Sequence, residues 1–299
     1  MPGWNEVLDE ISNSDKKHAF DYVRQKYLKK LSEHTGRNII AYYSGWLQNP
    51  DDAACSINDG DKNAFMATIH KLDRSKGLDL ILHTPGGQTA ATESIVDYLH
   101  SMFENDIRTI IPQLAMSAGT MIACATKEII MGEHSNLGPI DPQFGGIPAT
   151  GVIEEFHRAR EEIKDDPASA HIWQVIIGKY HPTFLGECEK AIEWSKEIVK
   201  EWLKKSMFEG DHDNKTIEKI IDALSDHSEM KTHSRHISKS QCKQIGLKVI
   251  DLESDSDMQD IVLSIHHAFM HSLSSGPGIV KIVENHDDTR FIERSMKGR

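Results

Sequence analysis

A serine flanked by small residues is the first candidate for chemistry in this chain. Ser117 stands in the segment AMSAG, residues 115–119, which follows an apolar run and opens a stretch of helical character. With Ala115 in place of the first glycine, the segment is one residue away from the G-x-S-x-G turn that exposes a nucleophilic serine at the end of a strand. A serine at the start of a helix is also a common N-cap. Ser117 is therefore either a nucleophile or a capping residue.

A second turn of small residues lies one strand–helix unit earlier. The segment HTPGGQT, residues 83–89, ends an apolar run and contains Gly86 and Gly87. Glycines adopt positive φ and allow a close approach of the backbone. Backbone N–H groups left uncovered beside a helix N-terminus can stabilise an oxyanion, although Pro-Gly-Gly is also common in simple turns. Both turns would open at the carboxyl edge of one sheet, so together they favour a nucleophile beside an oxyanion hole.

A serine hydroxyl needs a base before it can attack, and histidine and lysine are the candidate types. The chain has 17 histidines, so their number alone selects none of them. Asp141, in the segment GPIDPQFGG, lies 24 residues after Ser117 (141 − 117). One helix and one strand fit in this interval, so the chain can return to the same edge of the sheet. An aspartate between two prolines can also be a plain turn former.

The elements around these turns alternate between strands and helices, which predicts βαβ units and a mostly parallel sheet, an α/β fold. Apolar runs predict strands, and helical periodicity predicts helices before, between and after them. The predicted strands are 38–46, 78–84, 107–114 and 128–132, and the predicted helical stretches are 4–34, 62–74, 88–103, a helix starting near Ser117, about 152–224, and 258–273.

Three regions follow from this pattern. We predict an N-terminal helical segment, a catalytic domain that includes a helical insertion, and a C-terminal helix with a strand-like tail. Their ranges are 1–35, 36–255 with the insertion at about 152–230, and 256–299.

Composition sets the broad class of protein. The 299 residues are 38% hydrophobic and 27% charged, which is typical of a globular chain, and the net charge of −12 argues against nucleic-acid binding. Four cysteines without CxxC spacing favour a reducing compartment. No stretch resembles a signal peptide or a membrane span, so we expect a soluble, cytoplasmic protein. Histidine-containing segments lack a metal-binding spacing, so no metal or other cofactor is expected, and His266, His267 and His271 are expected on a solvated helix face.

Three segments together resemble the Clp protease/crotonase superfamily, namely LILHTPGGQTAATESIVDYL, AMSAGTMIACA and GPIDPQFGG. In that superfamily an SPGG-like turn supplies the oxyanion hole, a small-residue turn carries the serine, and the following loop usually carries the histidine. Here that loop carries Asp141, while the later stretch KTHSRHISKSQCKQIGLKV has His233 and His236 and lacks the usual acid. Acid and base are thus exchanged, as in the serine dehydrogenase proteinases, which the chain resembles over roughly residues 5–250.

The resemblance implies a Clp protease/crotonase-like fold with additional helices and a serine protease that uses a Ser–Asp–His triad. It assigns Ser117 as the nucleophile, Asp141 as the residue that orients the histidine, and His233 as the general base. His236 is the alternative base. The oxyanion hole would be formed by Gly86, Gly87 and the N–H of Ala118.

The resemblance also implies partners. The substrate would be a peptide, or an unfolded or membrane-derived protein. Self-association is expected because the superfamily builds rings and trimers and because the helical segment 152–206 offers apolar faces. Many relatives carry an N-terminal membrane helix, which we do not expect here.

Other functions stay open at this point. A Ser–Lys dyad, as in signal peptide peptidase A-like enzymes, would use Lys164, 47 residues after Ser117 (164 − 117), although acidic neighbours would keep that lysine protonated. An α/β-hydrolase esterase has the same order of residues but a different spacing. A crotonase-like acyl-CoA or ester hydrolase could use Asp141 as its base. A non-enzymatic assembly protein on the same scaffold is the remaining class.

Overall fold

The computed structural model describes residues 3–211, 214–225, 235–276 and 278–295. A seven-stranded sheet forms its centre, in the order β10-β5-β3-β2-β1-β11-β12. The strands from β10 to β1 run parallel, while β11 is antiparallel to β1 and β12 to β11. The predicted α/β fold with a mostly parallel sheet is confirmed. The strands are β1 (Asn38–Ser44), β2 (Leu78–His83), β3 (Ile107–Ile111), β5 (Glu128–Met131), β10 (Val249–Asp251), β11 (Ile279–Asn285) and β12 (Arg290–Arg294).

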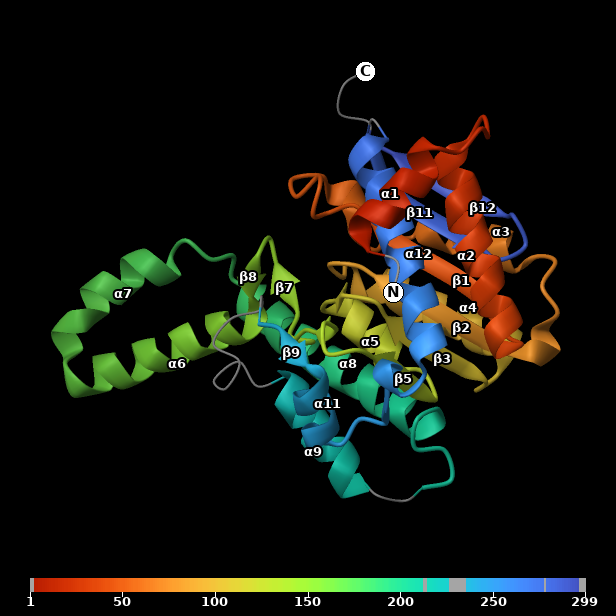
Figure 1. Ribbon diagram of the computed structural model, residues 1–299. Coiled ribbons are helices and arrows are strands. Elements are labelled where there is room, and N and C mark those ends of the chain that lie inside the picture. The colour runs from red at the N-terminus through yellow and green to blue at the C-terminus, as the bar shows by residue number, and fades with distance from the viewer. Residues whose placement is uncertain (1–2, 212–213, 226–234, 277, 296–299) are drawn as a thin grey trace.

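Helices cover both faces of this sheet (Figure 1). One face carries α1 (Trp4–Ser12), α2 (Ala19–Thr35) and α12 (Ser256–Ser275). The other face carries α3 (Asp61–Ile69), α4 (Thr89–Phe103) and α5 (Ala118–Cys124). Three further helices pack into the core on this second face, namely α8 (Phe184–Lys205), α9 (Asn214–Ser225) and α11 (Lys239–Ile245). Side chains alternate along β1, so Tyr42 stacks on Phe65 of α3 while Tyr43 stacks on Phe269 of α12. Burial on both faces explains why the strands are continuous apolar runs.

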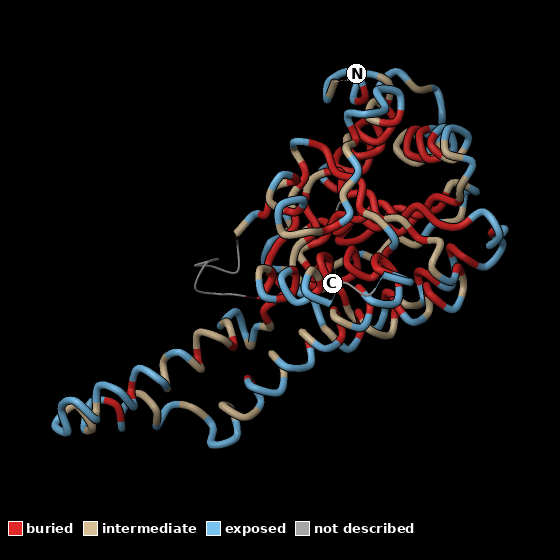
Figure 2. The backbone as a smooth tube through the Cα atoms, turned by 90° about the horizontal axis from the view of Figure 1, so that it is seen from below, coloured by how far each residue is buried: buried red, intermediate tan, exposed pale blue. Residues whose placement is uncertain are grey.

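Two helices extend away from this body as an arm (Figures 1 and 2). The hairpin of β7 (Gln143–Phe144) and β8 (Ile147–Pro148) leads into α6 (Ala149–Asp165), and α7 (Ala170–Ile177) follows it. Most of the arm is exposed, and on α7 both Ile172 and Val175 are 66% exposed. The predicted helical insertion thus comprises this arm together with α8 and α9.

The two ends of the chain differ in detail from the predicted pattern. The stretch 4–34 is two helices rather than one, because α1 ends at Ser12 and α2 begins at Ala19. The strand-like tail is the β11–β12 hairpin, which extends the sheet beyond β1. Residues of all three predicted regions meet in one core, for example Val23, Ile81 and Ile265. Over the ranges that the structure describes, no helix has the length and hydropathy needed to cross a membrane.

A second, three-stranded sheet lies in the order β4-β6-β9. Its strands are only two residues long: β4 (Leu114–Ala115), β6 (Asn136–Leu137) and β9 (Ile237–Ser238). β4 and β6 are parallel, and β9 is antiparallel to β6. β4 leads into Ser117 and β6 leads into the loop of Asp141, so this sheet brings the predicted site segments together.

The prediction of a solvated histidine face on α12 is wrong for two of its residues. His266 and His271 are 8% and 4% exposed, because α12 packs against α1, α2 and the sheet. The His266 ring packs against the rings of Tyr43 and His83. His83 is fully buried at the end of β2, and within the described chain neither of its ring nitrogens has a hydrogen-bond partner.

These buried histidines predict an acid-sensitive fold. Burial lowers the pKa of His266 to about 3 and also lowers the pKa of His83, because the charged form loses its hydration. An unfolded histidine has a pKa near 6.5, so as the pH falls from about 6.5 towards 3 the unfolded state binds protons that the folded state does not. The free energy of unfolding then falls by up to about 1.4 kcal/mol per pH unit for each such histidine.

We expect His83→Phe to make this fall shallower, since phenylalanine fills an aromatic site and removes a titrating group that donates no hydrogen bond. Denaturant unfolding from pH 7 to pH 4 measures the slope. The exposed His157 on α6 provides the control variant His157→Gln, which should keep the wild-type slope. An unchanged slope in His83→Phe would contradict this account.

Candidate active site

Ser117 occupies a sharp junction between β4 and α5. Its backbone has φ 51° and ψ −115°, a conformation that residues other than glycine rarely adopt. Although Ser117 directly precedes α5, its hydroxyl accepts no hydrogen bond from the described backbone of that helix. The capping interpretation therefore lacks its hydrogen bond. Strained backbone of this kind is typical of the turns that present nucleophilic serines.

Close packing explains the small residues on either side of Ser117. A Cβ atom on Gly119 would lie 2.5 Å from Cγ2 of Thr84, so only glycine fits there. Ala115 forms a parallel bridge with Thr84. The Thr84 N–H donates to the Leu114 carbonyl at 3.1 Å, and the Met116 N–H donates to the Thr84 carbonyl at 3.0 Å. The end of β2 is thus fixed beside the serine junction.

The Gly86–Gly87 turn lies directly against Ser117. Gly86 has φ +99°, and a Cβ atom there would come within 2.7 Å of the Cβ of Ser117. A Cβ on Gly87 would lie 2.3 Å from the backbone of Ile57. Ile57 brackets the turn, because its N–H donates to the Gly86 carbonyl at 2.8 Å and its carbonyl accepts from the Gln88 N–H at 2.9 Å. Both glycines are therefore required by close approach.

The backbone N–H groups at this junction differ in their availability. The N–H of Gly86 donates to Oγ1 of Thr84 at 3.1 Å. Within the ranges that the structure describes, the N–H groups of Gly87 and Ala118 donate to no acceptor. The Ala118 nitrogen lies 2.9 Å from the position of a Cβ on Gly86, so the two turns face each other. Two open donors thus flank Ser117.

Thr120 connects α5 to the loop of Asp141. Its Oγ1 accepts from the Gly138 N–H at 2.9 Å and lies 2.9 Å from the carbonyl oxygens of both Ala115 and Gly138, to one of which it donates at a time. Further along the loop, the Ile140 N–H donates to the Leu224 carbonyl of α9 at 2.9 Å. Asp141 follows at only 3% exposure. The loop is therefore anchored on both the serine helix and α9.

A pocket of about 420 Å³ joins the three segments. The Pro85–Thr89 turn, Ser117 and the loop after β6 all contribute to it. Asp141 is buried between two of its lining residues, Ile140 and Pro142, and none of the described lining residues is charged. The lining consists of Ser56, Pro85, Gly86, Gly87, Gln88, Thr89, Ser117, Met121, Ile140, Pro142, Gln143 and Gly146.

The two candidate histidines stand differently in the structure. His233 belongs to residues 226–234, which lie outside the described residues. His236 is exposed directly before β9 and is not among the described residues that line the Ser117 pocket. The neighbouring Ile237 pairs with Leu137 of β6. The described chain is thus anchored near the Asp141 loop both before and after 226–234, at Leu224 and at Ile237.

Lys164 is not brought to Ser117. Its side chain is 74% exposed near the end of α6, on the arm that leaves the body (Figure 1), and lies 3.6 Å from Glu161. It does not line the Ser117 pocket. The position of Lys164 gives no support to a Ser–Lys dyad within one chain.

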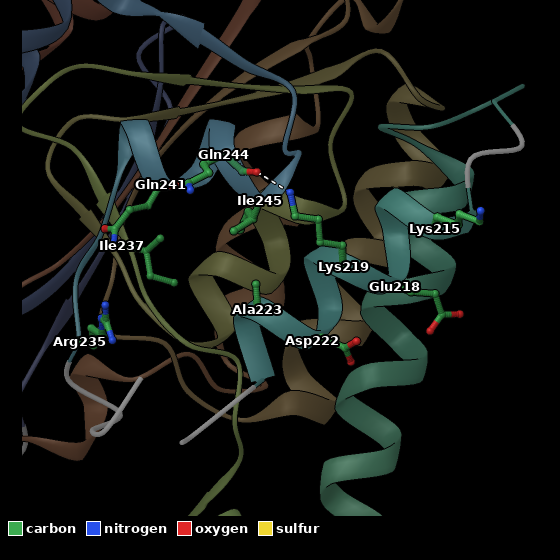
Figure 3. A pocket seen from close by; sticks show the side chains of 10 residues that line it. All are labelled: Lys215, Glu218, Lys219, Asp222, Ala223, Arg235, Ile237, Gln241, Gln244 and Ile245. Carbon is green, nitrogen blue, oxygen red and sulfur yellow. Dashed lines mark hydrogen bonds between the residues drawn. The ribbon is translucent and has the colours of Figure 1, made fainter. Parts of the chain in front are cut away.

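A larger pocket lies elsewhere, between α9 and α11 (Figure 3). It measures about 720 Å³, and charged side chains of α9 and amide side chains of α11 line it. Lys219 bridges the two helices by donating to the Gln244 carbonyl at 2.7 Å. No described serine or cysteine lines this pocket, and the described residues contain no cluster of three side chains placed to hold a metal ion. The smaller Ser117 pocket is the one that holds the predicted nucleophile and the glycine turn.

A sheet edge that sets a strained serine junction against a glycine turn with open N–H donors is the arrangement of a serine hydrolase. The chain belongs to the family of ClpP-like SDH-type serine proteinases, whose family model matches residues 11–260. This confirms the family predicted from the three segments. The chain is a serine proteinase by family.

The chain is also similar to individual proteins. The chain is 34% identical over 233 residues to an uncharacterized protein of Methanocaldococcus jannaschii, covering 76% of this chain and 71% of the relative. It is 31% identical over 233 residues to a second uncharacterized protein of that organism, covering 76% and 73%. Over 70 residues it is 36% identical to the ATP-dependent Clp protease proteolytic subunit of Lactococcus lactis, which covers 22% of this chain and 35% of that protein.

Sequence reasoning missed three residues that shape the site. Thr84 holds the Gly86 N–H, Thr120 holds the Asp141 loop, and Ile57 brackets the glycine turn. The two threonines stand inside the segments HTPGG and SAGT, and the position of Thr84 at a strand end could have indicated a role. Ile57 carried no such signal, because it acts through its backbone.

Proposed function

We propose that this protein is a serine endopeptidase with Ser117 as the nucleophile, His233 as the general base and Asp141 as the residue that orients the histidine. One observation carries the proposal. The strained Ser117 junction stands against the Gly86–Gly87 turn, with the N–H groups of Gly87 and Ala118 open beside it.

The proposed reaction uses these groups in two halves. His233 takes the proton of the Ser117 hydroxyl as Oγ bonds to the peptide carbonyl carbon, and the N–H groups of Gly87 and Ala118 stabilise the oxyanion. The intermediate then collapses, the C–N bond breaks, and the histidine gives its proton to the leaving amine. A water molecule, deprotonated by the same histidine, hydrolyses the acyl-enzyme and frees Ser117. Gly86 contributes close approach rather than a donor, since its N–H is held by Thr84.

The pairing of β6 with β9 supports His233 as the base. Leu137 is paired with Ile237 in antiparallel register. Asp141 lies four residues after Leu137 (141 − 137), and His233 lies four residues before Ile237 (237 − 233). The number of residues from the Leu137–Ile237 pair to Asp141 is therefore the same as the number from that pair to His233. His236 is only one residue from the pair, which favours His233.

The surroundings of the pocket support an extended peptide as the substrate. A second pocket of about 510 Å³ shares Gln88, Thr89, Pro142 and Gln143 with the Ser117 pocket and adds aromatic surface from Phe144 and Trp194. None of the described residues that line the Ser117 pocket is charged, and the cleft continues past the nucleophile to Glu187 and Lys190 in the second pocket. A long cleft of this kind suits an extended chain rather than one small ligand.

A fluorophosphonate, which phosphonylates activated serines with loss of fluoride, tests the proposed function. We expect it to label the wild type at Ser117 and to leave Ser117→Ala unlabelled, with peptide mapping by mass spectrometry as the measurement. Ser56 lines the same pocket, so Ser56→Ala is the matched control and should be labelled like the wild type. An unlabelled wild type, or a label on Ser56, would remove Ser117 as the nucleophile.

We also propose that the chain self-associates through the arm. Ile172 and Val175 expose apolar surface on α7 that a second copy could cover. Light scattering is expected to give a mass that is a multiple of the 33.7 kDa chain. Replacing both residues with serine should lower that mass. A monomer in the wild type at micromolar concentration would rule out this association.

A further inference from the structure

The segment 55–58 is held against the oxyanion turn by a series of backbone contacts. Ile57 bonds to the Gly86 carbonyl and the Gln88 N–H on either side of Gly87. At the start of the segment, the Cys55 carbonyl accepts from the buried Ser44 hydroxyl at 2.6 Å. The direction of the Gly87 N–H therefore depends on where this segment lies.

A buried ion pair fixes the rest of the segment. Lys281 of β11 is fully buried, and its Nζ lies 2.8 and 3.0 Å from the two carboxylate oxygens of Asp61, which is 1% exposed. The same ammonium donates to the Ser56 carbonyl at 3.0 Å. The Asp61 carboxylate accepts from the Asn58 N–H at 2.9 Å and from the Tyr42 hydroxyl at 3.0 Å. The two charges thus hold the residues on both sides of Ile57.

We propose that Asp61 and Lys281 are positioning residues for the oxyanion hole, acting through Ile57 on the N–H of Gly87. This inference rests on the proposed function for its effect on catalysis. A buried charge pair is a costly way to stabilise a core, because well-packed apolar residues often do as well. It does supply directional hydrogen bonds, and here those bonds end on the two residues that flank Ile57. Oxyanion donors are effective only when they are already aligned before the reaction.

A second buried ion pair on the same strand provides a matched control. Glu284 of β11 is fully buried, and it accepts from Nε of Arg24, 1% exposed, at 2.6 Å. Arg24 also donates to Ser272 of α12, which lies on the other face of the sheet. This pair is equally buried but makes no contact with segment 55–58 in the described chain.

The experiment compares two double variants in the full-length protein, Asp61→Asn/Lys281→Met and Arg24→Met/Glu284→Gln. Removing both charges together avoids leaving one buried charge without its partner. We expect the first variant to lower kcat for a peptide substrate by about 10- to 100-fold with KM changed less than about 2-fold, since an oxyanion donor acts in the transition state. The second variant should keep kcat within about 2-fold of the wild type, although it should lose about as much thermal stability as the first variant.

Two further measurements keep the test decisive. Tyr42→Phe removes one hydrogen bond to Asp61 without a change of charge and should lower kcat by a smaller factor in the same direction. Hydrogen exchange of residues 83–90 should accelerate in Asp61→Asn/Lys281→Met and stay unchanged in the control pair. A folded Asp61→Asn/Lys281→Met variant with wild-type kcat overturns the proposal. If fluorophosphonate fails to label wild-type Ser117, the proposed function fails, and exchange alone then decides: faster exchange supports positioning of the turn, and unchanged exchange overturns it.

Discussion

Replacing His233 with alanine is expected to abolish peptide cleavage, with a loss of about 10⁶-fold in kcat, because no other group would take the proton of the Ser117 hydroxyl. Ser117→Ala should cost about as much. Serine and histidine act as one unit, so the double variant should be no slower than either single variant. Steady-state kinetics on a fluorogenic peptide measure all three, with circular dichroism to show that the variants are folded.

His236→Ala is the matched control for this prediction. It removes an exposed histidine three residues away (236 − 233) and should retain most of the activity. The opposite result, an active His233→Ala and an inactive His236→Ala, would transfer the role of base to His236. Wild-type activity in both variants would rule out a triad with either histidine as its base.

Asp141→Asn is expected to lower kcat by about 10⁴-fold while the protein stays folded. An amide keeps the shape of the carboxylate, but it cannot stabilise the imidazolium and favours the wrong tautomer of the histidine. The buried Asp79 supplies the control, because its carboxylate pairs with Arg37 and Arg108 near the opposite end of β2 from the glycine turn.

Asp79→Asn should therefore lower the melting temperature while kcat stays near the wild-type value. Activity of Asp141→Asn within tenfold of the wild type would show that Asp141 is only a turn former. The comparison of kcat with melting temperature separates a role in chemistry from a role in folding.

Much of the fold was predictable because local chemistry determines it. Apolar runs mark strands that are buried on both faces. The glycines of AMSAG and HTPGG are required because a Cβ atom at any of them would lie less than 3 Å from a neighbouring atom. The same local reasoning places Ser117 and Gly87 at one edge of the sheet. These features need no knowledge of distant contacts.

The features that could not be predicted depend on contacts between residues far apart in the chain. The burial of His266 follows from packing of α12 against α1, α2 and the sheet, and the sequence of a helix does not reveal its neighbours. The pairing of β11 with β1 joins residues 279–285 to 38–44, and the Lys281–Asp61 bridge spans 220 positions. Periodicity reports which side of an element is apolar, but not which element will cover it.

The small β4-β6-β9 sheet has a consequence for how such sites can diverge. Its parallel strands β4 and β6 and its antiparallel strand β9 deliver the chain before Asp141 and the chain after residue 234 to one place. A carboxylate on one of these two segments and an imidazole on the other could be exchanged without any change in strand order. On the proposed triad, the order of acid and base along the chain is therefore set by two side chains and not by the topology of the backbone. A reversed triad then requires no new fold, only two substitutions, one on each of these two segments.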